Sequence, residues 1–169
     1  IARAQTGDFP GARADATQAY SIADSYPSWA REMFLLAGAR AAIEEHYGDQ
    51  ARQILGDVAF AALDEDQVAE FTLLTGRVAE EAEQFDTALD TYGQVIASEV
   101  RPSRAEAVYR TLGILDKQKR LDVVRGAQTL AAEALLWRGD ALEAKMQGML
   151  ANLYFRTGEY RQGFESVMA

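Results

Sequence analysis

The sequence predicts an all-α protein of about nine or ten helices that form antiparallel pairs. Apolar residues recur at helical spacing along most of the chain, whereas no alternating run of five or more residues between turn signals indicates a strand. One position in the second helix of each pair also recurs, at intervals of 39, 37, 36 and 39 residues: Ala12, Ala51, Ala88, Val124 and Gly163. Such a period predicts repeated helix-turn-helix units.

The clearest unit runs from Phe71 to Pro102. Gly76 in its first helix and Ala88 in its second would let the two helices approach closely, because neither carries a bulky side chain. Phe85 stands three residues before Ala88, and Tyr92 stands four residues after it. The unit should end at its proline, which cannot continue a helix.

This unit resembles a tetratricopeptide repeat, whose pattern is W-x2-L-G-x2-Y, then A-x3-F, then P. Thr72 and Ala79 stand where the pattern has Trp and Tyr, so the first helix lacks those aromatic residues. The last repeat, around 150–163, matches the pattern at most positions. The resemblance implies an α-solenoid, which is a right-handed superhelix of stacked antiparallel helix pairs. Sel1-like and HEAT-like helix pairs remain alternatives.

The chain is predicted to be a single tetratricopeptide-like domain over residues 1–169. Its 169 residues can form one core, and no Pro-, Gly- or Ser-rich linker divides them. Because the sequence begins at Ile1 inside an expected helix, we expect a fragment of a longer chain. A partial repeat is expected at 1–25, and full repeats at about 27–63, 65–101, 103–138 and 140–169.

Three full helices are expected in the first 62 residues, after a short helical tail that Gly7 closes. Asp8 is the predicted N-cap of a helix that runs to about Asp24 and tolerates Pro10 in its first turn. The next helix runs from about 27 to 45, and the third from about 49 to 62.

Similar signals bound the remaining helices. Asp64, with Gln67 three residues later, predicts a capping box at the start of the next helix. Lys117 and Lys119 suit the carboxyl end of the helix that Ser103 opens. Other helices are expected at about 85–98, 121–137, 141–156 and from 159 onwards, with turns at Arg138–Asp140 and Gly158.

Composition and charge limit the classes of function. The net charge of −9 argues against nonspecific nucleic-acid binding, which needs a basic surface. No apolar run approaches the ~20 residues of a membrane span, so no direct membrane insertion is expected. Zero cysteines fit either the bacterial cytoplasm or the periplasm, and Ala- and Arg-rich helices favour a bacterial origin.

Residues that carry chemistry are sparse. His46 is the only histidine, there is no cysteine, and no glycine-rich phosphate loop is present. The acidic run around Glu80, Glu81 and Glu83 is typical of a solvated helix face. We therefore expect a chain that is not an enzyme, with no catalytic residues, no cofactor and no metal.

The tetratricopeptide resemblance implies a concave face, formed by the first helix of each pair, that binds a peptide or a partner helix. Guanidinium groups at successive repeats could bind an acidic segment through paired hydrogen bonds. The competing hypothesis pairs these arginines with Glu70, Glu80, Glu106 or neighbouring acids of the chain itself. The candidate partner-binding residues are Arg40, Arg77, Arg110, Asn152 and Arg156.

The predicted function is a protein–protein interaction scaffold or adaptor. Three alternatives stay open: an assembly or regulatory component of a bacterial envelope machine for secretion or motility, the docking arm of an enzyme whose catalytic domain lies elsewhere, and a helical enzyme with inward-facing acid pairs. Oligomerisation through open solenoid ends is also left open. The sequence does not specify the partner.

Overall fold

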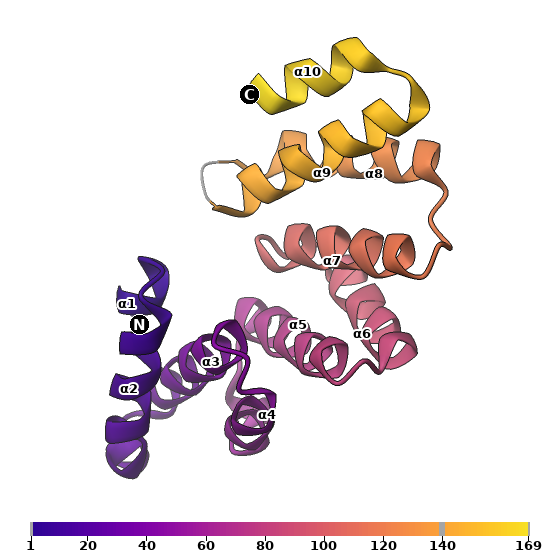
Figure 1. Cartoon of the computed structure of the whole chain (residues 1–169). Coiled ribbons are helices and arrows are strands. Elements are labelled where there is room, and N and C mark those ends of the chain that lie inside the picture. The colour runs from indigo at the N-terminus through magenta and orange to yellow at the C-terminus, as the bar shows by residue number, and fades with distance from the viewer. Residues whose placement is uncertain (1, 139–140, 169) are drawn as a thin grey trace. The chain divides into compact units, whose positions relative to one another are not determined.

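The computed structural model of this chain describes residues 2–138 and 141–168. These residues form nine α-helices of nine residues or more, the one-turn helix α1 and two short 3-10 segments, with no strand among them (Figure 1). The all-α prediction is confirmed for this part of the chain. Two residues of the predicted turn Arg138–Asp140, Gly139 and Asp140, lie outside the described residues.

The helices gather into two compact units, Ile1–Val100 and Arg101–Ala169, which we describe separately. The boundary coincides to within a residue with the end of the predicted repeat 65–101. That both units belong to one domain stays a prediction.

Unit 1 holds two helix pairs after its amino-terminal helices. α3 packs against α4 and α5 packs against α6, while α5 also contacts α3 and α4. The predicted capping box is present: Gln67 N donates to Asp64 Oδ1 (2.9 Å), and Asp64 N donates to Gln67 Oε1 (3.1 Å). The elements are α1 (Ala2–Gln5), α2 (Phe9–Ala19), η1 (Tyr20–Ser25), α3 (Ser28–Glu44), α4 (Gly48–Gly56), η2 (Phe60–Ala62), α5 (Glu65–Glu81) and α6 (Phe85–Ser98).

Two predicted helices of unit 1 end earlier than expected. The helix predicted to reach Asp24 ends at Ala19 and continues as the 3-10 segment η1. The helix predicted over 49–62 ends at Gly56, a residue type that favours helix ends. In the turn that follows, the buried carboxylate of Glu32 accepts a hydrogen bond from Ala59 N (2.9 Å).

The core of unit 1 lies where α3, α4 and α5 meet. Its buried side chains come from both helix pairs, so each pair covers apolar surface that the other could not bury alone. The cluster consists of Leu35, Leu36, Ala39, Ala42, Ile43, Ala51, Ile54, Leu55, Leu74 and Val78.

Gly76 makes the tightest approach between α5 and α6. A Cβ atom built there would lie 2.6 Å from the ring of Tyr92, which is fully buried. The side chain nearest to Gly76 is thus that of Tyr92, one turn further along α6 than Ala88. Ala88 is itself buried in α6.

Two glycine-to-alanine substitutions should have opposite effects on stability. Gly76→Ala should lower the free energy of unfolding by about 1–3 kcal/mol, because the new methyl group overlaps the Tyr92 ring. Gly93→Ala on α6 should raise it by about 0.5–1 kcal/mol, because nothing lies within 4 Å of the new Cβ and alanine favours the helix. Urea titrations would compare both with the unsubstituted chain, and equal effects would contradict the Gly76–Tyr92 packing.

Unit 2 is a run of four helices in which each packs against the next. Asp122 Oδ1 accepts from Arg125 N (3.0 Å) and caps the second of them, which therefore begins two residues after the predicted Leu121. The elements are α7 (Ser103–Lys117), α8 (Val123–Leu136), α9 (Ala141–Thr157) and α10 (Tyr160–Met168).

One predicted repeat position in unit 2 is wrong. Val124 is 53% exposed in the first turn of α8, whereas Ala127, three residues later, is buried. With Ala127 at this position the intervals from Ala88 and to Gly163 become 39 and 36 residues, so the period persists. The nearest side chain to Gly163 is that of Phe155 on α9.

The core of unit 2 also contains a buried acid. Glu133 on α8 receives hydrogen bonds from Arg101 Nε (3.2 Å) and Arg104 Nε (3.1 Å). The side chain of Glu133 is almost completely removed from water, while both arginines keep partial exposure. This three-residue cluster ties the start of α7 to the end of α8.

Candidate functional site

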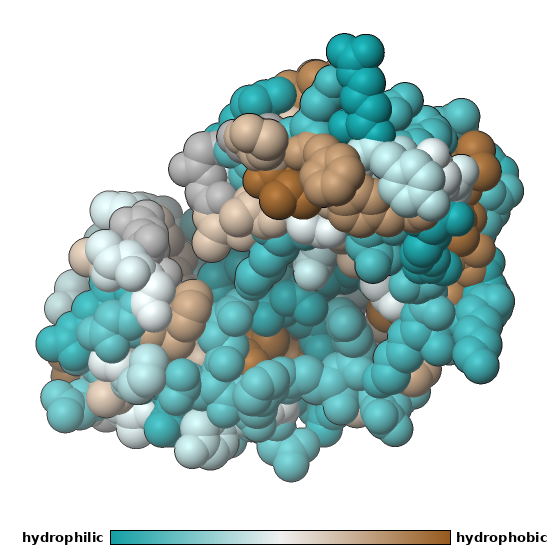
Figure 2. Space-filling view, turned by 45° about the horizontal axis from the view of Figure 1, so that its top comes forward, coloured by the Kyte–Doolittle hydropathy of each residue, from teal (hydrophilic) through white to brown (hydrophobic). Residues whose placement is uncertain are grey.

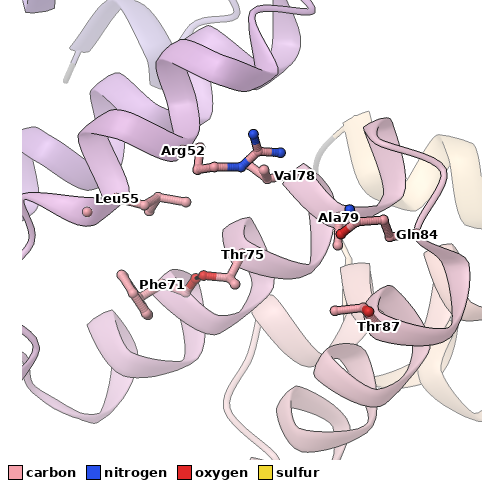
Figure 3. A pocket seen from close by; sticks show the side chains of 9 residues that line it. Arg52, Leu55, Phe71, Thr75, Val78, Ala79, Gln84 and Thr87 are labelled. Atoms are coloured by element: carbon pink, nitrogen blue, oxygen red, sulfur yellow. Dashed lines mark hydrogen bonds between the residues drawn. The ribbon is translucent and has the colours of Figure 1, made fainter.

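A groove of about 320 Å³ lies between α4, α5 and α6 in unit 1 (Figure 3). It falls within the size range typical of small-ligand sites, although it is open along one side. Its lining residues are Arg52, Leu55, Gly56, Phe71, Thr75, Val78, Ala79, Gln84 and Thr87.

The apolar lining of the groove comes from two neighbouring helices. Leu55 on α4 and Val78 on α5 belong to the core of unit 1, and their buried positions make this wall rigid. Phe71 on α5 packs edge-on against Phe60 of η2, with ring centroids 5.5 Å apart. Phe60 is mostly exposed, so it extends the apolar surface beyond the groove.

The polar rim carries one cation. Arg52 on α4 forms an ion pair with Asp49 one turn earlier, with 3.0 Å between Nη1 and Oδ1. Both side chains are mostly exposed, and such surface pairs contribute little, so a ligand carboxylate could replace Asp49. The groove can therefore accept an apolar side chain beside an acidic group.

The two predicted arginines of unit 1 both join α3 to α5. Arg40 Nε lies 3.1 Å from Glu70 Oε1, and both side chains are partly exposed. Arg77 Nη1 lies 2.6 Å from Glu44 Oε1, and the Arg77 side chain is only 5% exposed. Arg77 thus bridges the first helices of two pairs, and its guanidinium is not accessible to a peptide in this structure.

The three predicted residues of unit 2 lie on α7 and α9. Arg110 Nε donates to Glu106 Oε1 (2.8 Å) within α7, and Arg156 Nη1 on α9 donates to Asp116 Oδ1 (2.8 Å). Asn152 is exposed on α9.

The competing ion-pair hypothesis named two of the observed partners, Glu70 and Glu106. Glu80, its third, accepts a hydrogen bond from Tyr92 Oη (2.6 Å). Binding of a partner by the five candidate residues stays a prediction.

Sequence reasoning missed every residue of the groove. Leu55 and Val78 read as ordinary core positions, and Arg52 lies within a helix with no motif around it. The groove exists because the helix that contains Arg52 stops at Gly56 and leaves part of α5 uncovered. Gly56 is a residue type at which helices commonly end, but the expected helix was continued through it to about residue 62.

In the part of the chain that the structure describes, no group of three or more His, Asp or Glu side chains is arranged to hold a metal ion. His46 lies just after α3 at a left-handed φ of 62°, with Nδ1 3.3 Å from Glu81 Oε1. No described helix is both long enough and apolar enough to cross a bilayer.

Comparisons with known proteins gave no match to this chain, whether with protein-family models, curated proteins or solved structures.

Proposed function

We propose that this chain is a non-enzymatic interaction module, a tetratricopeptide-like α-solenoid that wraps as a right-handed superhelix and binds a segment of a partner protein. The observation that carries the proposal is the groove between α4, α5 and α6, where an apolar wall meets the Arg52 rim. The reciprocal ion pairs that join α3 and α5 also support it, because they are what two stacked repeats would use to align their first helices.

The groove favours a peptide with one apolar anchor followed or preceded by an acidic residue. Burying a Leu or Phe side chain against Leu55 and Val78 would contribute about 1.5–3 kcal/mol. A carboxylate beside Arg52 would add a charge-assisted hydrogen bond and would direct the peptide's orientation. The expected ligand is therefore an acidic, amphipathic segment that binds with micromolar affinity or weaker.

Arg52 replaces Arg77 as the main cation of the proposed site because Arg77 is buried in its pair with Glu44. Alanine at Arg77 would leave that glutamate without its cation and would lower stability, so it is a poor probe of binding. Arg40, Arg110, Asn152 and Arg156 remain candidates for additional contacts with a longer partner.

The test is selection of peptides from a random phage-displayed library, followed by affinity measurement with fluorescent peptides. We expect the selected peptides to share an apolar residue next to Asp or Glu. Thr75→Trp, which fills the groove from α5, should weaken their binding at least tenfold, and Arg52→Glu should weaken it severalfold with a smaller salt dependence.

Thr129→Trp on α8 is the matched control. Thr129 and Thr75 are both exposed helical residues whose hydroxyl donates to the carbonyl four residues earlier at 2.9 Å. Binding should be unchanged in this variant. Peptides that still bind the Thr75→Trp chain with full affinity would show that the groove is not the binding site.

A further inference from the structure

The large apolar side chains of α10 are mostly exposed. The helix packs on α9 through its small residues, Gly163 and Ser166, which are buried. The exposed side chains form a stripe along another side of the helix, at positions i, i+4, i+7 and i+8: Tyr160, Phe164, Val167 and Met168. Figure 2, in which α10 is turned towards the viewer, shows apolar groups (brown) gathered over that part of unit 2.

In unit 1 the equivalent helix, α4, has its apolar side covered by the next helix, α5. Leu55, four residues after the small Ala51, is 7% exposed because α5 packs over it. Val167, four residues after the equivalent Gly163, is 65% exposed. The apolar side of α10 is thus the surface on which another amphipathic helix would pack.

The apolar stripe on α10 is also wider than the apolar side of α4. Phe164 and Met168 stand where α4 has Arg52 and Gly56. Phe164 is held in place by an edge contact with Phe155, with centroids 5.3 Å apart, yet it remains 63% exposed. Exposed, pre-positioned aromatic side chains of this kind are typical anchors of protein interfaces.

We infer that α10 pairs antiparallel with α10 of a second copy of this chain, about a two-fold axis that passes near Phe164. This surface is distinct from the groove of the proposed function. The stripe is nearly symmetric about Phe164, with Tyr160 four residues before it and Met168 four residues after it. Each copy supplies an amphipathic helix that packs on the stripe of the other, as an isologous interface requires.

The charges beside the stripe complement each other in this arrangement. Arg161 and Glu165 lie along one edge of the stripe and form an ion pair within α10, with 2.8 Å between Nε and Oε1. In an antiparallel pair the same edges of both helices meet. A centre at Phe164 places Arg161 of one copy and Glu165 of the other about 3 Å apart along the helix axis. Two reciprocal ion pairs would form in place of the two internal ones.

The size of the stripe predicts a weak dimer. Two aromatic side chains, one valine and one methionine at this exposure would bury on the order of 500 Å² per copy. The total of about 1,000 Å² lies near the lower limit for specific interfaces. We therefore expect a dissociation constant in the range of about 1 to about 100 µM.

Sedimentation velocity of the 169-residue chain from about 1 to about 500 µM would test the dimer. The unsubstituted chain should pass from monomer to dimer over this range, and Phe164→Asp should raise the dissociation constant at least tenfold. Trp29→Asp is the matched control, because Trp29 is an aromatic residue of unit 1 with the same 63% exposure. Its dissociation constant should be unchanged.

Charge reversal separates pairing between copies from the ion pair inside one helix. Arg161→Glu and Glu165→Arg should each weaken the homodimer, whereas a mixture of the two variants should form a heterodimer with oppositely charged edges. Because the chain contains no cysteine, Phe164→Cys should also give a disulfide-linked dimer under mild oxidation, faster than Trp29→Cys does.

A chain that stays monomeric at every concentration would overturn the inference. So would a dimer that survives Phe164→Asp, or one that Trp29→Asp abolishes. Failure of the two charge variants to prefer each other, in a dimer that does depend on Phe164, would rule out the antiparallel arrangement.

Discussion

Replacing Tyr92 with alanine should lower the free energy of unfolding by about 3–5 kcal/mol. Tyr92 is the largest fully buried side chain in unit 1, and its ring fills the space that Gly76 leaves open on α5. Removal of the ring would leave a cavity between α5 and α6 and would strip Glu80 of the hydrogen bond from the tyrosine hydroxyl. Urea denaturation followed by far-UV circular dichroism would measure the loss.

Two further variants separate the contributions of Tyr92. Tyr92→Phe keeps the ring and removes only the hydroxyl, so a loss of about 1 kcal/mol is expected. Tyr26→Ala removes an exposed ring from the same unit and should change stability by less than about 0.5 kcal/mol. If Tyr92→Ala were no more destabilising than Tyr26→Ala, the packing of α5 on α6 described here would be incorrect.

Glu133→Ala should have the second largest effect, a loss of about 3 kcal/mol. The substitution removes the buried carboxylate to which Arg101 and Arg104 both donate, and leaves two positive charges without their shared acceptor. The value lies at the lower end of the usual range because both arginines retain access to water. Thermal and urea unfolding of the variant would measure the loss.

The control in the same unit is Asp116→Ala, which removes the exposed ion pair with Arg156. Exposed pairs contribute about 0–1 kcal/mol, so this variant should be almost as stable as the unsubstituted chain. Glu133→Gln, which keeps an acceptor oxygen but loses the charge, should lie between the two. Equal losses for Glu133→Ala and Asp116→Ala would show that burial of the Glu133 carboxylate does not govern its contribution.

The sequence alone determined the class of the fold and most helix ends, because these features depend on residues within one or two turns. The capping box of Asp64 and Gln67 is an example, since both partners are separated by only three residues. The buried small positions Ala51, Ala88 and Gly163 were also predictable, because a small residue at the crossing of a helix hairpin recurs with the repeat.

Tertiary structure alone decided the features that depend on residues far apart in the chain. Glu32 accepts a hydrogen bond from Ala59 N, 27 residues away, and so fixes the turn that follows α4, next to the groove that Arg52 lines. The packing of α3 against α5 likewise decides which acid each predicted arginine of unit 1 contacts. Arg40 on α3 pairs with Glu70 on α5, and Arg77 on α5 pairs with Glu44 on α3. Helical periodicity specifies which side of a helix is apolar, but not which element covers it. The exposure of the apolar stripe on α10 therefore depends on which helices pack around it, and the sequence alone does not give this.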